Sequence, residues 1–172
     1  MQNDRGPEHL HAPWRMEYIS QAGEPAPQCI FCTKSREERD RENYIVCRGK
    51  YTFIILNLFP YNNGHLMIVP YQHTAELTEL SPETQAEMMW MATLAVTALT
   101  QAMRPDGFNL GINLGRAAGA GIAEHLHLHV VPRWVGDTNF MPVFGNTRVL
   151  PESLEQTWEK VCAAFNALRG CP

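Results

Sequence analysis

The stretch EHLHLHVVPRW, residues 124–134, places a histidine at every second position and follows them with an apolar pair and a proline. Because successive side chains of a β-strand point to opposite faces, His125, His127 and His129 are expected to share one face. The apolar residues of this strand are expected on the other face, against the core: Leu126, Leu128 and Val130. A lone histidine is most often structural, but three in register indicate a functional surface.

Two kinds of chemistry suit such a row. Neutral imidazole is the commonest metal ligand, and two histidines one residue apart on a strand can hold one ion. Alternatively, one imidazole is a covalent nucleophile, while its neighbours orient it and donate to a bound phosphate. The preceding segment NLGRAAGAG, residues 113–121, favours a phosphate because its glycines let backbone N–H groups approach an anion. Taken alone, this loop is equally typical of a plain hairpin turn.

The remainder of the chain alternates between strand and helix patterns. Three strands are predicted as an antiparallel meander over residues 44–49, 51–58 and 65–70, and two more over 108–115 and 126–134. Ser81 as N-cap and Pro82 at the first helical position begin a long amphipathic helix that ends at residue 103. A second amphipathic helix is predicted over 151–168. This order of elements predicts an α+β domain with an antiparallel sheet.

The composition excludes several classes of protein. The chain of 172 residues is long enough for one domain with its own core, and its net charge of -4 gives no basic surface for a nucleic-acid polymer. It has no apolar run long enough to cross a membrane and no signal-peptide layout at its N-terminus, so we expect a cytoplasmic protein without a membrane partner. The odd count of five cysteines favours reduced thiols, with Cys29 and Cys32 as one possible metal or redox pair.

The segment HLHLHVV, residues 125–131, resembles the histidine triad (HIT) family, whose pattern is His-φ-His-φ-His-φ-φ with φ apolar. NLFPYNNGHLMIVP, residues 57–70, is similar to the family's substrate-side hairpin. The segments APWRMEYI, CIFC, GFNLGINLG, AEHLHLHVVPRW and GDTNF resemble the bacterial diadenosine tetraphosphate phosphorylase (ATP adenylyltransferase) branch. The resemblance implies a HIT-like antiparallel sheet with one long helix and a C-terminal helix. It also implies one domain over 1–172, with an N-terminal arm (1–28), a catalytic core (29–134) and a C-terminal loop and helix (135–172).

The resemblance implies a different role for each histidine. His127 corresponds to the family's nucleophile, which attacks the α-phosphorus and forms a nucleotidyl-histidine intermediate. His129 would donate to the phosphate oxygens, and a main-chain carbonyl near His125 would fix the tautomer of His127. His65 matches a histidine that lies beside the triad in relatives.

Further residues match the positions that hold the substrate. Asn57 matches a ribose contact and Asn113 a polar contact near the phosphates, while Gly119 and Gly121 belong to the glycine-rich loop. Many hydrolytic relatives have Gln followed by Ser or Thr where this chain has Gly121 and Ile122, so a side-chain donor is missing. This difference favours inorganic phosphate as the attacking group. We therefore expect phosphorolysis of diadenosine tetraphosphate to ATP and ADP first, and hydrolysis of dinucleoside polyphosphates or nucleoside phosphoramidates second.

Cys29 and Cys32 have the CxxC spacing that lets two thiolates bind one tetrahedral ion. The same spacing is a redox signature, but no thioredoxin-like βαβ pattern surrounds it. In zinc-bearing HIT relatives the other two ligands are a histidine after the VP strand and the first histidine of the triad, which match His73 and His125. The resemblance thus implies a closed, structural zinc site.

Two other hypotheses remain open at this stage. The chain could be a nucleotide-binding module with negligible turnover, or a metalloenzyme that uses the histidine row as an open metal site. The HIT relatives pair through the long helix and a sheet edge, so the resemblance also implies a homodimer. The expected small-molecule partners are a nucleotide or dinucleoside polyphosphate and inorganic phosphate.

Overall fold

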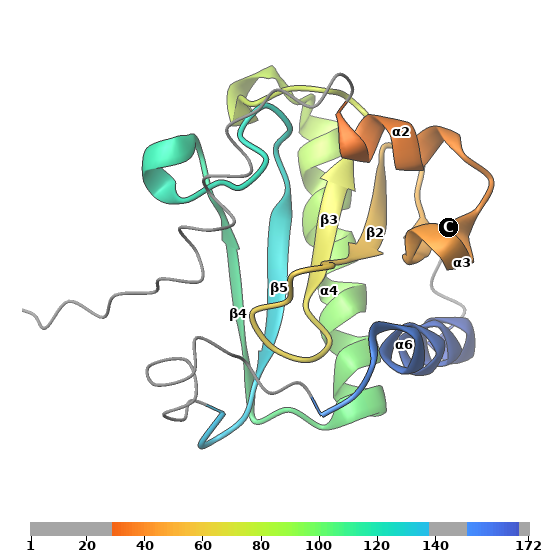
Figure 1. Ribbon diagram of the computed structural model, residues 1–172. Helices are drawn as coiled ribbons and strands as arrows, with labels where there is room; N and C mark the ends of the chain where they lie inside the picture. The colour runs from red at the N-terminus through yellow and green to blue at the C-terminus, as the bar shows by residue number, and fades with distance from the viewer. Residues whose placement is uncertain (1–28, 138–150, 169–172) are drawn as a thin grey trace, which may run out of the picture.

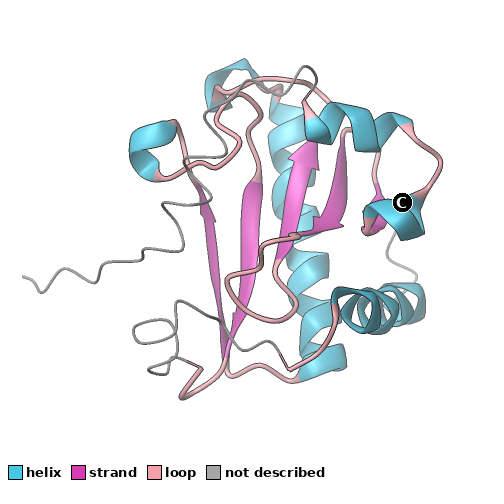
Figure 2. Cartoon of the chain, viewed as in Figure 1, coloured by secondary structure: helices cyan, strands magenta, loops and turns pink. Residues whose placement is uncertain are grey.

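The computed structural model describes residues 29–137 and 151–168, and the expected N-terminal arm lies outside these residues. One antiparallel sheet has the strand order β1-β2-β3-β5-β4 (Figure 1). The strands are β1 (Ile45–Arg48), β2 (Thr52–Leu56), β3 (Leu66–Pro70), β4 (Gly107–Ile112) and β5 (Leu128–Arg133). The helices are α2 (Ile30–Arg36), α3 (Asp40–Asn43), α4 (Pro82–Met103) and α6 (Leu154–Leu168), with short 3-10 turns η1 (Leu77–Glu79) and η2 (Arg116–Ala118). Figure 2 shows the resulting α+β architecture, which confirms the predicted fold class.

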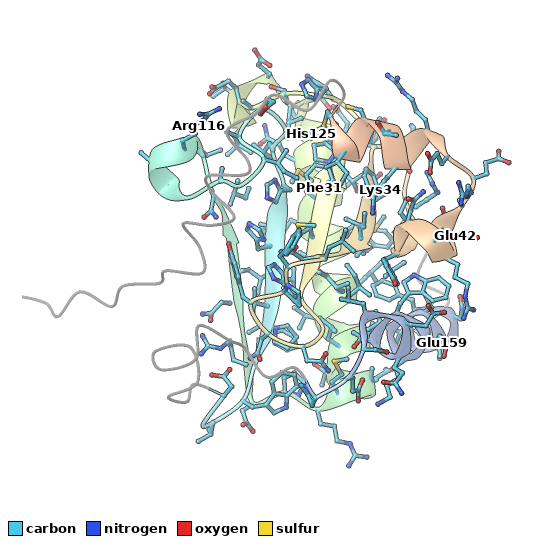
Figure 3. All side chains as sticks on the ribbon, viewed as in Figure 1. Phe31, Lys34, Glu42, Arg116, His125 and Glu159 are labelled. Atoms are coloured by element: carbon cyan, nitrogen blue, oxygen red, sulfur yellow. The ribbon has the colours of Figure 1, made fainter. Side chains whose placement is uncertain are left out.

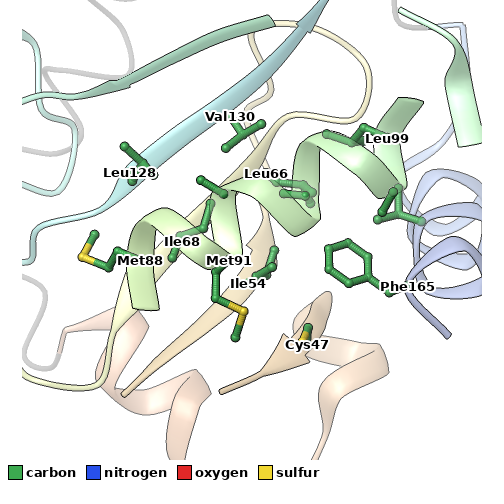
Figure 4. Close-up of a cluster of buried hydrophobic side chains, with 14 of the residues drawn as sticks. Cys47, Ile54, Leu66, Ile68, Met88, Met91, Leu99, Leu128, Val130 and Phe165 are labelled. Atoms are coloured by element: carbon green, nitrogen blue, oxygen red, sulfur yellow. The ribbon is translucent and has the colours of Figure 1, made fainter. Parts of the chain in front are cut away.

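Helix α4 lies along one face of the sheet and forms the main core with it (Figure 4). It begins as the sequence predicts, because the Ser81 hydroxyl accepts the Thr84 N–H at 3.1 Å and Pro82 follows the cap. The core side chains between α4 and the strands include Met88, Met91, Leu99, Ile54, Leu66, Ile68, Leu128 and Val130. Among the described residues, no helix is long and apolar enough to cross a membrane.

Within residues 29–137 and 151–168, the opposite face of the sheet is covered in part by α2. Phe31 of α2 packs there against side chains of β1, β2 and β3: Ile45, Phe53, Ile55, Met67 and Val69. The histidine row lies on this same face, because Met67 pairs with His129 and both side chains point away from α4. The arrangement therefore leaves one face for the core and the other for a site.

Helix α6 is the predicted C-terminal helix, and it packs against α4 and β1 (Figure 1). Val161 and Phe165 are buried in the main core. The Trp158 Nε1–H donates to the Ile45 carbonyl at 2.9 Å, and the Thr157 hydroxyl donates to Asn63 Oδ1 at 3.0 Å. This helix thus supports the loop between β2 and β3.

The cysteines differ in their chemical state. Cys29, Cys32 and Cys162 are free thiols, whereas Cys47 is disulfide-bonded. The expectation that the thiols are reduced is therefore wrong for Cys47, since an odd number of cysteines does not prevent one pair. Both members of the CxxC pair remain available as ligands.

Candidate active site and metal centre

The three histidines of the row are buried side by side, but strand β5 begins only at Leu128. His125 and His127 thus precede the strand, which corrects the predicted start at residue 126. The segment stays extended because the Leu126 N–H donates to the Thr74 carbonyl at 2.7 Å. The alternation therefore persists, with Leu126 in the main core and the histidines on the other face.

The two nitrogens of His127 have different surroundings. Its Nδ1–H donates to the His125 carbonyl at 2.9 Å, which leaves the lone pair on Nε2. The ring packs between Phe31 at 5.3 Å and His129 at 4.7 Å, measured between ring centroids. Burial lowers the pKa of His127 below its usual value, and the hydrogen bond to the carbonyl opposes this only in part. His127 is therefore a neutral imidazole with one oriented lone pair, which suits a nucleophile.

His129 is oriented by a chain of hydrogen bonds that begins in the loop between β2 and β3. The Tyr61 backbone N–H donates to His65 Nδ1 at 3.0 Å, so His65 must carry its proton on Nε2. That proton faces His129 Nδ1 at 2.9 Å, which makes this nitrogen an acceptor. In its neutral form His129 then carries its proton on Nε2, the form that donates to an anion. His65 is completely buried, so the chain of donors is shielded from water.

The predicted substrate-binding residues lie around this row. Asn57 supports the same loop, because its Oδ1 accepts the Phe59 N–H at 3.0 Å and its Nδ2 lies 3.3 Å from His65 Nδ1. Asn113 lines a pocket together with His129, and its Nδ2 lies 3.5 Å from the Gly119 carbonyl. Gly119 has a positive φ of 85°, which favours glycine there.

The segment that joins the glycine-rich loop to the triad begins with the apolar residue Ile122. Gly121 is half-buried, and Ile122 packs against the cluster of Phe31, Ile55 and Met67. Ile122 therefore extends the apolar wall of the site where many relatives have a hydroxyl side chain. The loop contributes glycines and backbone groups at this point.

Four side chains from three segments converge at the other end of the row. The sulfur of Cys29 lies 3.2 Å from His125 Nδ1, and that of Cys32 lies 3.4 Å from His73 Nδ1 and 3.6 Å from His125 Nδ1. The two Nδ1 atoms are 3.2 Å apart, and all four potential ligand atoms lie within 4.8 Å of one another. This set, hereafter the Cys2His2 cluster, could hold a metal ion.

The spacing of these atoms fits a tetrahedral ion. With Zn–N of about 2.1 Å and Zn–S of about 2.3 Å, tetrahedral geometry separates two nitrogens by about 3.4 Å and a nitrogen from a sulfur by about 3.6 Å. The two distances from the Cys32 sulfur, 3.4 and 3.6 Å, are close to these values. The Cys29–His125 and His73–His125 distances, both 3.2 Å, are somewhat shorter. The Nε2–H of His125 donates to the Pro70 carbonyl at 2.9 Å, which turns the Nδ1 lone pair toward the cluster. Burial lowers the pKa of His125 to about 4, so the ring is neutral as a ligand must be.

Two residues of the site were not predicted from the sequence. Phe31 lies between the two cysteines in sequence, and its ring contacts that of His125 (Figure 3). The same ring also contacts that of His127. Tyr61 supplies the backbone N–H that fixes the His65 tautomer, and its ring lies 5.7 Å from that of His129. An aromatic residue between two ligand cysteines was the available signal for Phe31; a backbone donor such as that of Tyr61 leaves no signal in a sequence.

Comparisons with known proteins agree with this geometry. The HIT domain family matches residues 38–135. AP-4-A phosphorylase of Mycobacterium tuberculosis is 42% identical over 157 residues, which cover 87% of this chain and 80% of that protein. Adenylylsulfatase HINT3 of Arabidopsis thaliana is 34% identical over 110 residues, covering 61% of this chain and 52% of that protein.

A solved structure shares the fold over most of both chains. The Zn-bound histidine triad family protein from Mycobacterium smegmatis superimposes with a TM-score of 0.67 at 31% identity, covering 83% of this chain and 96% of that chain. The family match spans the sheet, the long helix and the histidine row together. The chain therefore belongs to the HIT domain family and is an enzyme of that family.

Proposed function

We propose that the protein transfers a nucleotidyl group from a dinucleoside polyphosphate to inorganic phosphate, with diadenosine tetraphosphate as substrate and ATP and ADP as products. The observation that carries this proposal is the single oriented lone pair of His127, fixed by the His125 carbonyl at 2.9 Å. The similarity to the AP-4-A phosphorylase of M. tuberculosis supports the substrate class.

The reaction proceeds in two displacements at one phosphorus. The Nε2 lone pair of His127 attacks the α-phosphorus, the N–P bond forms, and the bond to the bridging oxygen breaks, so that ATP leaves with that oxygen. An oxygen of inorganic phosphate then attacks the same phosphorus, the N–P bond breaks, and ADP leaves. His129 holds charge on the phosphate oxygens through its Nε2–H, an orientation set by His65. His127 returns to its neutral form.

Phosphate, and not water, is our proposed attacking group because of the loop before the triad. Gly121 and Ile122 supply no side-chain hydroxyl or amide that could orient a water molecule. Gly115 in the same loop has open space where a Cβ would lie, which leaves room for a larger anion. The alternative is hydrolysis of dinucleoside polyphosphates or nucleoside phosphoramidates. The similarity to an adenylylsulfatase supports this alternative, in which AMP is released.

Incubation with diadenosine tetraphosphate, with and without inorganic phosphate, tests the proposal. We expect ADP and ATP in equal amounts, formed only when phosphate is present. AMP and ATP formed without phosphate would show hydrolysis. If no product formed at all, the result would support a nucleotide-binding module with negligible turnover. Without phosphate, the adenylyl group should remain on the protein as an acid-labile adduct, which His127→Ala should not form.

We further propose that the Cys2His2 cluster binds a structural zinc ion. The four residues fit a closed tetrahedral site with no open position for a water or substrate. Bound zinc would tie α2 and the segment after β3 to the start of the histidine row, and it would take no part in the displacements. The zinc in the histidine triad family protein from M. smegmatis supports the identity of the metal.

A homodimer is our proposed assembly. Strand β4 is at the edge of the sheet, and Leu110 and Leu114 are about half exposed at or just beyond it. Met89 and Trp90 of α4 are also exposed, although large apolar side chains are usually buried. Light scattering after size exclusion should give twice the mass of 19.5 kDa; a mass equal to one chain would contradict the proposal.

A further inference from the structure

We propose that the pocket beyond His129 binds the nucleobase of the second nucleoside, the one that leaves with the departing nucleotide. This inference rests on the proposed function and adds a subsite to it. The pocket has a volume of about 170 Å³ and lies between the sheet and the Tyr61 ring. In Figure 1 the loop that carries Tyr61 reaches across β5, where Asn62 Nδ2 donates to the Pro132 carbonyl at 3.1 Å.

The pocket lies at the His129 end of the histidine row, opposite the Cys2His2 cluster. The centroid of the His127 ring is 4.7 Å from that of His129, and the centroid of the Tyr61 ring is 5.7 Å from that of His129. Phe31 and the Cys2His2 cluster occupy the other end, beside His125. A dinucleotide has one nucleoside at each end of its phosphate chain, and the attacking and leaving atoms are roughly in line. The two nucleosides therefore need separate subsites along the row.

The floor of the pocket is flat because a glycine lies next to His129. Gly111 of β4 pairs directly with His129 of β5, and Asn109 pairs with Val131. A Cβ atom added at Gly111 would meet no other heavy atom within 4 Å. A planar ring can thus lie on the sheet beside the His129 imidazole. The side chain of any residue other than glycine at position 111 would occupy this space.

The lining of the pocket suits an uncharged aromatic ring. The Tyr61 ring lines the pocket, and none of the described residues that line it is a lysine or an arginine, so a phosphate would gain no charge partner from them. Asn109 Oδ1 accepts from Arg133 at 2.8 Å, and Arg133 is itself held by Asp137. This fixes the amide, whose Nδ2 donates to no group in the described part of the chain. A ring nitrogen of a base can accept that donor.

The size of the pocket also fits a base. A protein cavity of about 150 Å³ binds one benzene molecule. The pocket is slightly larger, and its open side leaves room for the remainder of a purine and for the attached ribose. The polyphosphate chain would then pass His129, the donor that the hydrogen-bond chain from Tyr61 orients.

A pair of matched glycine variants tests the subsite. Gly111→Val fills the floor, while Gly107→Val makes the same change on the same strand and face, opposite Arg133 and away from the pocket. Neither glycine has a positive φ, and neither would place a Cβ against another atom. Valine suits a strand, so both variants should fold. The substrates are diadenosine tetraphosphate and adenosine 5′-tetraphosphate, which has the same phosphate chain without the second nucleoside.

Two ratios compare diadenosine tetraphosphate with adenosine 5′-tetraphosphate for each protein. The first is the ratio of their kcat/KM values. The second is the ratio of their Kd values, measured in a His127→Asn background that cannot turn them over. We expect the wild type to prefer the dinucleotide about tenfold, as one stacked base contributes. Gly111→Val should bring both ratios close to one, and Gly107→Val should keep them. Equal ratios in wild type and Gly111→Val would overturn the subsite.

The outcomes separate this inference from the proposed function. If the wild type turns over neither substrate, the proposed function fails, and the Kd ratios alone decide on the subsite. A change of assembly caused by a variant of the edge strand would affect both substrates alike and leave the ratios unchanged. Tyr61→Ala gives an independent check, because it removes the stacking ring but keeps the backbone N–H that orients His65. It should lower the same ratios about tenfold.

Discussion

The two ends of the histidine row have the same side chain in different surroundings. At His125, one ring nitrogen is held by the Pro70 carbonyl and the other meets two sulfurs and a second imidazole. At His129, Nδ1 accepts from the protonated Nε2 of His65, whose other nitrogen is fixed by a backbone N–H. The surroundings of His125 direct several lone pairs toward one position, where a metal ion can bind, whereas the surroundings of His129 fix which of its nitrogens carries the proton. The chemistry of a histidine is thus decided by the atoms that meet its two nitrogens.

The largest expected effect tests the residue between the two ends. His127→Asn removes the nucleophilic Nε2 but keeps an amide that can donate to the His125 carbonyl. Turnover of diadenosine tetraphosphate should fall by at least about 10³-fold, because the lone pair of His125 points into the Cys2His2 cluster and His129 carries its proton on Nε2. The melting temperature, measured by calorimetry, should change by only a few degrees. Retention of a tenth of the wild-type rate would show that another group is the nucleophile.

Removal of the metal tests the His125 end. An ion present at about 1,000 times its Kd stabilises the folded state by about 4 kcal/mol. For a chain of this size, chelation should therefore lower the melting temperature by roughly 10 °C. The loss should match the zinc content determined by mass spectrometry, and Cys32→Ser should reproduce it.

The matched control for this experiment is Cys162→Ser, which changes a free thiol outside the Cys2His2 cluster. That variant should keep both the zinc and the response to the chelator. The chelated protein, assayed well below its melting temperature, should still form the adduct on His127. Immediate loss of this chemistry in folded, metal-free protein would support a catalytic metal in place of a structural one.

The His129 end is tested by breaking its hydrogen-bond chain. His65→Leu leaves the Tyr61 N–H and His129 Nδ1 without their partner, so the proton of His129 is no longer fixed. We expect kcat to fall about 10–100-fold, as for other groups that orient a functional histidine. His65→Gln keeps one acceptor and one donor and should recover most of the rate. If the His65→Leu and His65→Gln variants have the same kcat at equal stability, the hydrogen bonds through His65 do not control the proton position of His129.

The sequence was sufficient for the elements with strong patterns. β-Branched and aromatic residues between turn signals located β1, β2 and β3, alternation located β5, and the Ser81-Pro82 start located α4 to within a residue. Helix α2 was missed, because its seven residues contain only one buried side chain, Phe31, and therefore show no amphipathic period. The start of β5 was placed early, since the alternation continues through His125 and His127 without ladder pairing.

The site was predictable in its residue types and not in its connections. Spacing indicated that the row shares a face, and the resemblance to the HIT family implied the ligands His73 and His125. The link from Tyr61 to His129 includes a hydrogen bond between His65 and His129, which are 64 positions apart, and this bond depends on the register between β3 and β5. No local pattern encodes such a register. The open space at Gly111 could not be predicted from the sequence either, because it depends on the positions of side chains that are distant in sequence.

The smallest expected effect concerns the pH dependence of His127, whose ring is buried between the two ends. Only the neutral imidazole is a nucleophile, and burial against Phe31 disfavours the charged form, so the pKa lies below the usual 6.5. Activity should therefore persist as the pH falls through 6.5 and decline only below it. Because inorganic phosphate titrates near neutrality, the measurement is the single-turnover rate of adduct formation without phosphate. An acidic limb at or above 6.5 would mean that water reaches the ring in solution, and that the apolar wall of Phe31 and Ile122 does not enclose it.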